Sequence, residues 1–216
     1  MKKRLFVMLV AAIAMLLTSC GIVQRMVMPE KTIAPSRGYW DGNTFVSAYF
    51  GLCFDVPNHW TVMSDEDKTR MRLEYGVFFP QISAGAAITP DMYKYFEAMR
   101  FVDMMAEYWD GESEIIVHMV IVGLPANAPD MTSAELQPFW AEILSLHYLS
   151  EYVVMHDDTV RIGSLDWYVI EQRIVNSGDV FDMHFLNIDG RFIRYITIGY
   201  LHVEDLENTI ALFRPY

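Results

Sequence analysis

The chain has 216 residues, with 28 acidic and 16 basic side chains and a formal net charge of −12 at pH 7. Its composition, 53% hydrophobic and 14% aromatic, is typical of a packed globule and excludes a largely disordered chain. Because the acidic excess repels phosphate backbones, we expect no nucleic-acid partner.

The first residues of the chain predict an export signal. The basic residues Lys2 to Arg4 precede an apolar run, Leu5 to Leu17, that is too short to span a bilayer comfortably. The tetrapeptide Leu17-Thr18-Ser19-Cys20 resembles the bacterial lipobox, whose cysteine thiol receives a diacylglyceryl group and becomes the first residue of the mature chain. An ordinary signal peptide or a plain membrane anchor is the alternative.

The lipobox implies a lipid-anchored protein on the extracytoplasmic face of a bacterial cell membrane. We expect a signal peptide over residues 1–19, the lipidated Cys20 with a flexible tether over 20–38, and a single domain over 39–216. Loss of three basic residues with the leader changes the net charge from −12 to −15, so the lipid and not a basic patch must hold the protein to the membrane. Gly21, after the cysteine, leaves the inner and the outer membrane both open.

The domain is predicted to open with β-structure. Residues 44–50 and 52–56 are rich in aromatic and β-favouring side chains on either side of Gly51, which indicates a hairpin or a bent strand. Cys53 lies in this apolar stretch and is expected to be a buried small hydrophobic residue. A helix is predicted to begin at the capping residue Ser64, a loop to cover 76–91, and a short helix to cover 91–99.

A hairpin and a helix follow. Residues 101–108 and 114–122 flank Asp110-Gly111, a strong turn signal, and the second of these strands is apolar on both faces, as in a central strand. The sequence Thr132-Ser133-Ala134-Glu135 resembles a capping box and precedes apolar residues at helical spacing as far as His147. Pro138 is expected to kink this helix or shift its start.

The clearest pattern covers residues 164–200. It predicts three antiparallel strands joined by turns at Ser177-Gly178 and Asp189-Gly190. A final helix over 203–213 is predicted from four apolar residues on one face.

The stretch from Tyr49 to Trp60 follows the pattern aromatic-x-Gly-Leu-x-Phe-x-x-Pro-x-x-Trp. It resembles the opening of the PsbP-like domain found in small bacterial lipoproteins. The resemblance implies an α+β fold in which helices flank an antiparallel sheet, an α/β/α sandwich, and the predicted elements fit this order. It also favours binding and supplies no catalytic residues, because members of that family share no single activity.

Familiar catalytic, phosphate-binding and metal-binding motifs are missing from the sequence, so we expect no cofactor and no metal. His156-Asp157-Asp158 offers three possible ligands, but consecutive side chains on a strand point to opposite faces, and a turn is the simpler interpretation. His118 lies in an apolar strand and is expected to be a core or edge histidine.

Strand register suggests one candidate site. Two-residue turns at Asp189-Gly190 and Ser177-Gly178 would place His184 opposite both Tyr195 and Glu171, and Asp182 opposite both Thr197 and Arg173. One face of the three strands would then carry a polar group with an aromatic residue at one end: Trp167, Glu171, Arg173, Asp182, His184, Tyr195 and Thr197. Ion pairs on a wet sheet face are one interpretation of this group. A ligand groove is the other, with Trp167 as a stacking wall.

Two functions follow from these interpretations. The first is a membrane-anchored binding module whose partner is another extracytoplasmic protein or an envelope component. The second is an envelope hydrolase that uses Glu171 and His184 for proton transfer and Arg173 for anion contact. A concave site with Glu171 and His184 together would favour the hydrolase.

Overall fold

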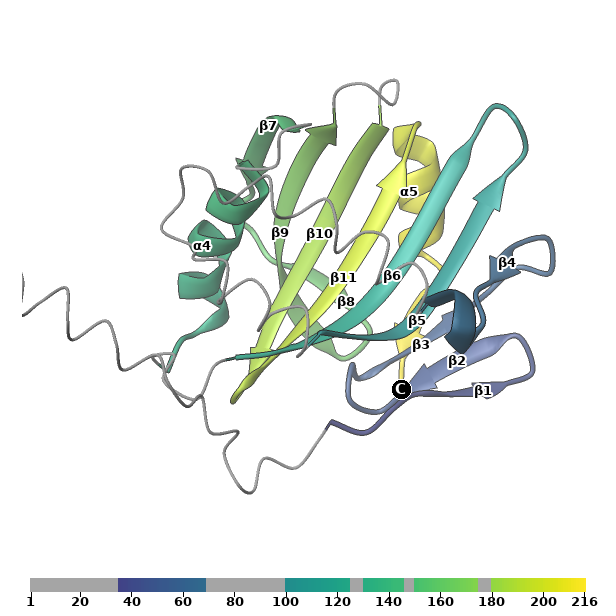
Figure 1. Cartoon of the computed structure of the whole chain (residues 1–216), viewed down its shortest axis with the longest axis horizontal. Helices are drawn as coiled ribbons and strands as arrows, with labels where there is room; N and C mark the ends of the chain where they lie inside the picture. Colours follow the sequence, from purple (N-terminus) through teal and green to yellow (C-terminus); the bar gives the residue numbers. More distant parts are fainter. Residues whose placement is uncertain (1–34, 69–99, 125–129, 146–149, 175–179) are drawn as a thin grey trace, which may run out of the picture.

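The computed structural model describes residues 35–68, 100–124, 130–145, 150–174 and 180–216. Most of these residues form two antiparallel sheets, and the helices are minor elements (Figure 1). Cys20, most of the predicted tether, the predicted loop over 76–91 and the predicted helix over 91–99 lie outside the described residues. None of the helices in the described part has the length and hydrophobicity needed to cross a bilayer.

The large sheet has eight strands. Seven follow the order β4-β5-β6-β11-β10-β9-β7, and β8 pairs with β9 beside β7. Their bounds are β4 Thr61–Val62, β5 Arg100–Trp109, β6 Glu114–Gly123, β7 Ser150–Met155, β8 Val160–Ile162, β9 Leu165–Ile174, β10 Val180–Asp189 and β11 Phe192–Tyr200. The predicted hairpin at Asp110-Gly111 and the three strands over 164–200 are confirmed. Strand β6 is central and largely buried, as its apolar sequence indicates.

The small sheet has the order β1-β2-β3-β12 and joins the two ends of the described chain. Its strands are β1 Tyr39–Asp41, β2 Thr44–Ser47, β3 Leu52–Asp55 and β12 Phe213–Pro215. Strands β2 and β3 are the predicted hairpin, and Cys53 on β3 is buried and free, as expected. The last predicted helix is shorter than expected, since α5 spans Val203–Ile210. Phe213 lies beyond it in strand β12 and pairs with Phe54 of β3.

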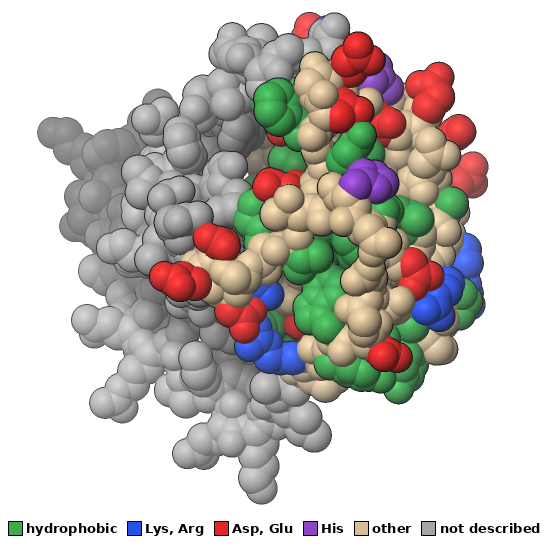
Figure 2. Space-filling view, turned by 90° about the vertical axis from the view of Figure 1, so that its right-hand side faces the viewer, with side chains coloured by type: hydrophobic (Ala, Val, Ile, Leu, Met, Phe, Trp, Pro, Cys, Tyr) green, Lys and Arg blue, Asp and Glu red, His purple; other side chains and the backbone are tan. Residues whose placement is uncertain are grey.

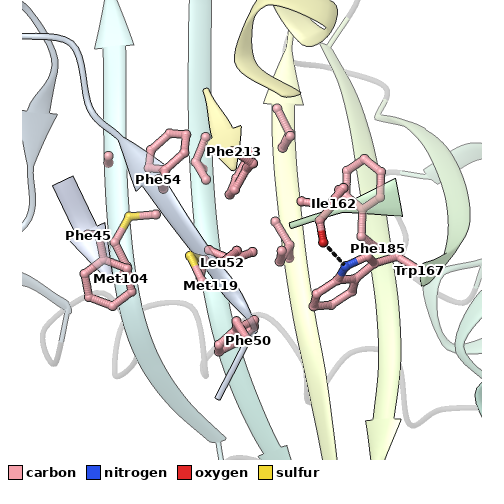
Figure 3. Packing of buried hydrophobic residues seen from close by; sticks show 14 of the residues in the cluster. Phe45, Phe50, Leu52, Phe54, Met104, Met119, Ile162, Trp167, Phe185 and Phe213 are labelled. Carbon is pink, nitrogen blue, oxygen red and sulfur yellow. Dashed lines mark hydrogen bonds between the residues drawn. The ribbon is translucent and has the colours of Figure 1, made fainter. Parts of the chain in front are cut away.

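Each face of the large sheet has a different cover. One face, which we call the α4 face, packs against helix α4, Ser133–Ser145, through Leu136, Ala141, Ile170 and Leu186. The other, the small-sheet face, packs against the small sheet and α5 around aromatic side chains that include Phe50, Phe54, Trp167 and Phe185 (Figure 3). The predicted α/β/α sandwich therefore needs correction, because a second sheet and not helices alone covers one face. The coarser α+β class stands, with sheet in excess.

The caps of two helices agree with the sequence. Thr132 and Glu135 form the predicted capping box: the Thr132 N–H donates to Glu135 Oε2 at 2.8 Å, and the Glu135 N–H donates to Thr132 Oγ1 at 3.3 Å. Ser64 Oγ accepts the N–H of Asp67 at 3.1 Å, as expected for a helix that begins there. Pro138 lies inside α4 and supplies no N–H to its hydrogen bonds.

Candidate functional site

The structure gathers four of the seven predicted site residues on the α4 face. Asp182, His184, Tyr195 and Thr197 lie there together with Gln172, which the predicted register did not include. We call these five residues the His184 cluster. Strand β10 supplies Asp182 and His184, β11 supplies Tyr195 and Thr197, and β9 supplies Gln172.

Hydrogen bonds fix the protonation state of His184. Gln172 donates through its amide nitrogen to the Leu144 carbonyl of α4 at 3.4 Å, so its oxygen must accept from His184 Nε2 at 3.1 Å. The proton of His184 is therefore on Nε2, and Nδ1 accepts from the Tyr195 hydroxyl at 2.5 Å. Thr197 Oγ1 lies 3.5 Å from the same Nδ1.

Burial keeps His184 neutral. Only 3% of the residue is exposed, and this burial, with a smaller contribution from the nearby charge of His118, lowers the pKa of His184 to about 3. Both ring nitrogens are already engaged at neutral pH. A general base needs an open nitrogen near a substrate proton, and His184 has none. The group therefore supports the sheet and is poorly suited to proton transfer.

Asp182 lies two residues from His184 on the same face. Burial raises the pKa of its carboxyl group to about 6, because lost hydration disfavours the ionised form. Its partner across the strand pair is Gly199, and a Cβ placed on that glycine would lie 3.0 Å from Asp182 Oδ1. The missing side chain at Gly199 thus leaves space for the carboxyl group.

The other three predicted site residues lie on the small-sheet face. Glu171 accepts from the Tyr152 hydroxyl at 3.1 Å, and Arg173 pairs with Glu151 at 3.0 Å. Trp167 is fully buried and donates through Nε1 to the Ile162 carbonyl at 3.1 Å, so it is a core residue and not a stacking wall (Figure 3).

Register explains this separation. Strand β10 pairs Met183 with Glu171 and His184 with Ile170, one residue away from the predicted alignment, and a shift of one residue turns every side chain of β9 to the other face. On the other side, β10 pairs His184 with Thr197, two residues away from the predicted pairing with Tyr195, which preserves the face. The predicted Glu171–His184 pair is therefore wrong, and so is the predicted Arg173–Asp182 pair.

The structure also locates His156 and His118, the two other histidines considered in the sequence. His156 Nε2 lies 3.5 Å from Glu171 Oε2, and Asp157 and Asp158 are exposed in a bend. Among the described residues no group of three or more potential ligands could hold a metal ion. His118 pairs with Thr197 between β6 and β11, beside the His184 cluster.

A second site, which the sequence did not predict, lies beside β4, at the edge of the large sheet. The turn between β1 and β2 and the turn between β3 and β4 enclose a groove of about 320 Å³. We call it the aromatic groove. It is lined by Trp40, Gly42, Asn43, Val56, Pro57, Asn58, Trp60 and Val62. Figure 2 shows this side of the molecule, where hydrophobic side chains gather between uncharged groups, and both acidic and basic side chains lie around them.

Local contacts hold the groove in shape. The Val56 N–H donates to the Asn43 carbonyl at 3.0 Å and joins the two turns. Trp60 stacks on Tyr108 of β5 with ring centroids 6.2 Å apart. Trp40 packs against Phe45 at 5.2 Å but stays 40% exposed. The groove thus presents indole surface to solvent from a supported position.

The polar groups of the groove are neutral. Asn43 Nδ2 donates to Asn58 Oδ1, and none of the eight lining residues is charged. That bond leaves the Asn43 oxygen and the Asn58 amide nitrogen for a further partner. Neutral amides beside indole rings are a combination suited to binding and not to acid–base chemistry.

No protein-family model matches the sequence, and no curated protein is significantly similar to it. The fold is similar to the solution structure of PsbP (CyanoP) from the cyanobacterium Synechocystis sp. PCC 6803, at 12% identity over 87% of this chain and 96% of that chain, with a TM-score of 0.42. It is also similar to the crystal structure of LpqN, a protein involved in cell envelope biogenesis in Mycobacterium tuberculosis, at 9% identity over 74% of this chain and 76% of that chain, with a TM-score of 0.36. The choice of function therefore depends on the residues of this chain.

Proposed function

We propose that this chain is a lipid-anchored binding module on the extracytoplasmic face of a bacterial membrane, and that it holds an envelope component in the aromatic groove. The observation that carries the proposal is the groove itself. Exposed indole surface, neutral amides and a concave shape meet there on supported backbone. Ligand sites are typically concave, largely apolar and provided with a few placed polar groups.

The arrangement of the acid–base groups favours binding over hydrolysis. Glu171 and His184 lie on opposite faces of the large sheet, and the imidazole of His184 is buried, neutral and fully bonded. Arg173 lies on the same face of the large sheet as Glu171 and forms an ion pair with Glu151. The hydrolase alternative has therefore lost its candidate pair.

Anchoring is tested in intact cells. Cells are fed an alkyne fatty acid, and the chain is compared with a Cys20→Ser variant. We expect label on the unaltered chain and its loss in C20S, together with digestion by protease added outside spheroplasts. Retention of the label in C20S, or full protection from external protease, would contradict the proposed location.

Binding at the groove is tested separately with the full chain purified from membranes. Wall and membrane fractions of the native host are sedimented with the protein, and the bound amount is measured. We expect Trp40→Ala to lose most of this retention. Trp109→Ala is the matched control, because Trp109 is 74% exposed and does not line the groove. Equal retention of W40A and W109A would exclude the groove as the binding site.

A further inference from the structure

We propose that the ligand of the aromatic groove is a neutral saccharide. This inference rests on the proposed binding function and adds the chemical class of the ligand. Three features of the groove support it: the exposed indole surface of Trp40, the pair of side-chain amides and the lack of charge in the lining.

The aromatic faces suit the apolar side of a sugar ring. An aromatic ring carries negative charge density on its face, which attracts the weakly positive C–H groups of a pyranose. Trp40 of β1 and Trp60, in the turn before β4, both line the groove, and Trp40 keeps 40% of its surface exposed. Contact with a ligand would remove this indole surface from water, which is favourable.

The amides suit hydroxyl groups. Asn43 donates to Asn58 within the groove, so the Asn43 oxygen can still accept a hydrogen bond and the Asn58 N–H₂ group can still donate one. A pair of neighbouring sugar hydroxyls can both donate and accept and matches this pair. A hydrocarbon chain would leave both amide groups without partners, which costs free energy when water is excluded.

Charge separates saccharides from the other candidates. All eight lining residues are uncharged, while the chain has a net charge of −12. An anionic ligand, such as a phosphate or an acidic glycan, would meet an acidic protein without a lysine or arginine in the groove. A cationic ligand would find the indoles but no carboxylate among the lining residues. A neutral polyhydroxylated ligand has neither difficulty.

The size of the groove fits a short segment of such a ligand. Its volume of about 320 Å³ is at the lower end of the roughly 300–1,000 Å³ that ligand pockets occupy. We therefore expect weak binding of an oligosaccharide and weaker binding of a monosaccharide.

Calorimetric titration of the full chain tests the proposal. The protein is purified from membranes in a polyoxyethylene detergent, because a detergent with a sugar headgroup would compete. It is titrated with neutral hexasaccharides (maltohexaose, chitohexaose and a mannohexaose), with anionic oligogalacturonate and cationic chitosan oligomers, and with phosphatidylcholine vesicles. We expect saturable binding of at least one neutral hexasaccharide and none of the charged oligomers.

Two variants connect this binding to the groove. Trp40→Ala should weaken the neutral hexasaccharide roughly tenfold or more, and Trp109→Ala should not change it. Asn58→Asp keeps an oxygen for Asn43 to donate to but removes the N–H₂ group, so it should also weaken binding while leaving the melting temperature unchanged. N58D thus remains informative if W40A proves unstable.

The outcomes are distinct. Failure of every neutral hexasaccharide to bind, or binding that W40A and N58D leave unaltered, would overturn the saccharide proposal. Binding of vesicles or of charged oligomers that W40A abolishes would also overturn it, but would leave the binding function at the groove intact. Loss of retention on envelope fractions in W40A, without any saccharide binding, would likewise overturn the saccharide class alone.

Discussion

Replacement of His184 with Gln should alter stability in a manner that depends on pH. The pKa of His184 in the folded protein is about 3, against an ordinary value of 6.5. Between about pH 3 and 6.5, His184 is therefore protonated in the unfolded chain and neutral in the folded protein. The contribution of the neutral His184 to stability is therefore complete above pH 6.5 and declines as the pH falls. Each pH unit below 6.5 costs about 1.4 kcal/mol. A glutamine at this position cannot titrate, so the free energy of unfolding of H184Q does not contain this pH-dependent loss.

The magnitude follows from the same values. At about pH 7.5 the variant should be less stable by about 1–3 kcal/mol, because the Tyr195 hydroxyl and the Gln172 oxygen lose their partners. At about pH 5.5 the unaltered protein has lost about 1.4 kcal/mol through His184. The difference between the two proteins should therefore shrink by about that amount. Asp182 titrates in both and cancels to first order.

Urea unfolding followed by tryptophan fluorescence measures both differences. A pH of about 5.5 is suitable because it stays above the isoelectric point of 4.8, where the chain would aggregate. Thr197→Val is the control: it contacts the same imidazole but does not titrate, so its effect should be nearly the same at both pH values. If H184Q costs as much at about pH 5.5 as at about pH 7.5, His184 accepts protons freely in the folded protein, and the assigned bonding is wrong.

Three further changes test other parts of the fold. Asp182→Asn should raise the free energy of unfolding by about 1–3 kcal/mol at about pH 7.5, measured by urea unfolding. A carboxyl group whose pKa is raised to about 6 contributes stability at low pH, and this contribution is lost as the pH rises from 3.8 to 6. A lower free energy of unfolding in D182N would contradict that sign. Gly163→Ala should lower the melting temperature far more than Gly42→Ala. Both glycines have φ near +60°, but a Cβ on Gly163 would lie 2.6 Å from the Gly51 carbonyl oxygen, whereas nothing lies within 4 Å of a Cβ on Gly42. Equal shifts in melting temperature would show that the close approach at Gly163 does not exist. Thr132→Ala should cost about 1 kcal/mol of unfolding free energy through the lost cap of α4, and no change would mean that the cap contributes nothing.

Local signals in the sequence predict the longer elements. Alternating side chains and glycine turns are contained in ten to twenty consecutive residues, and they are sufficient for the hairpin at Asp110-Gly111 and the three strands over 164–200. Strands β1, β4, β8 and β12 could not be predicted in this way, because a strand of two or three residues shows no periodicity. They exist through distant pairing, as where Arg214 of β12 lies opposite Cys53 of β3.

The prediction of the candidate site failed at the register between β9 and β10. Ile174 of β9 pairs with Val180 of β10, whereas a two-residue turn at Ser177-Gly178 would pair Ile174 with Phe181; residues 175–179 themselves lie outside the described part of the chain. The Ser177-Gly178 signal did not determine the register, and an error of one residue moved Glu171 and Arg173 to the other face. The pairing of β10 with β11 was also displaced, by two residues, but an even displacement keeps His184 and Tyr195 on one face. Sequence alone could therefore predict the members of that half of the cluster.

The aromatic groove and the His184 cluster divide two tasks between different parts of the molecule. The cluster lies among buried groups, where loss of one partner leaves others unsatisfied, and so H184Q should change stability but not ligand affinity. Trp40 is 40% exposed and belongs to a terminal strand, so W40A should change affinity with a small effect on stability. Measuring the unfolding free energy and the ligand affinity of both H184Q and W40A decides whether stability and binding depend on different residues. A loss of binding in H184Q at full folding would mean that the cluster, and not the groove alone, contributes to the site.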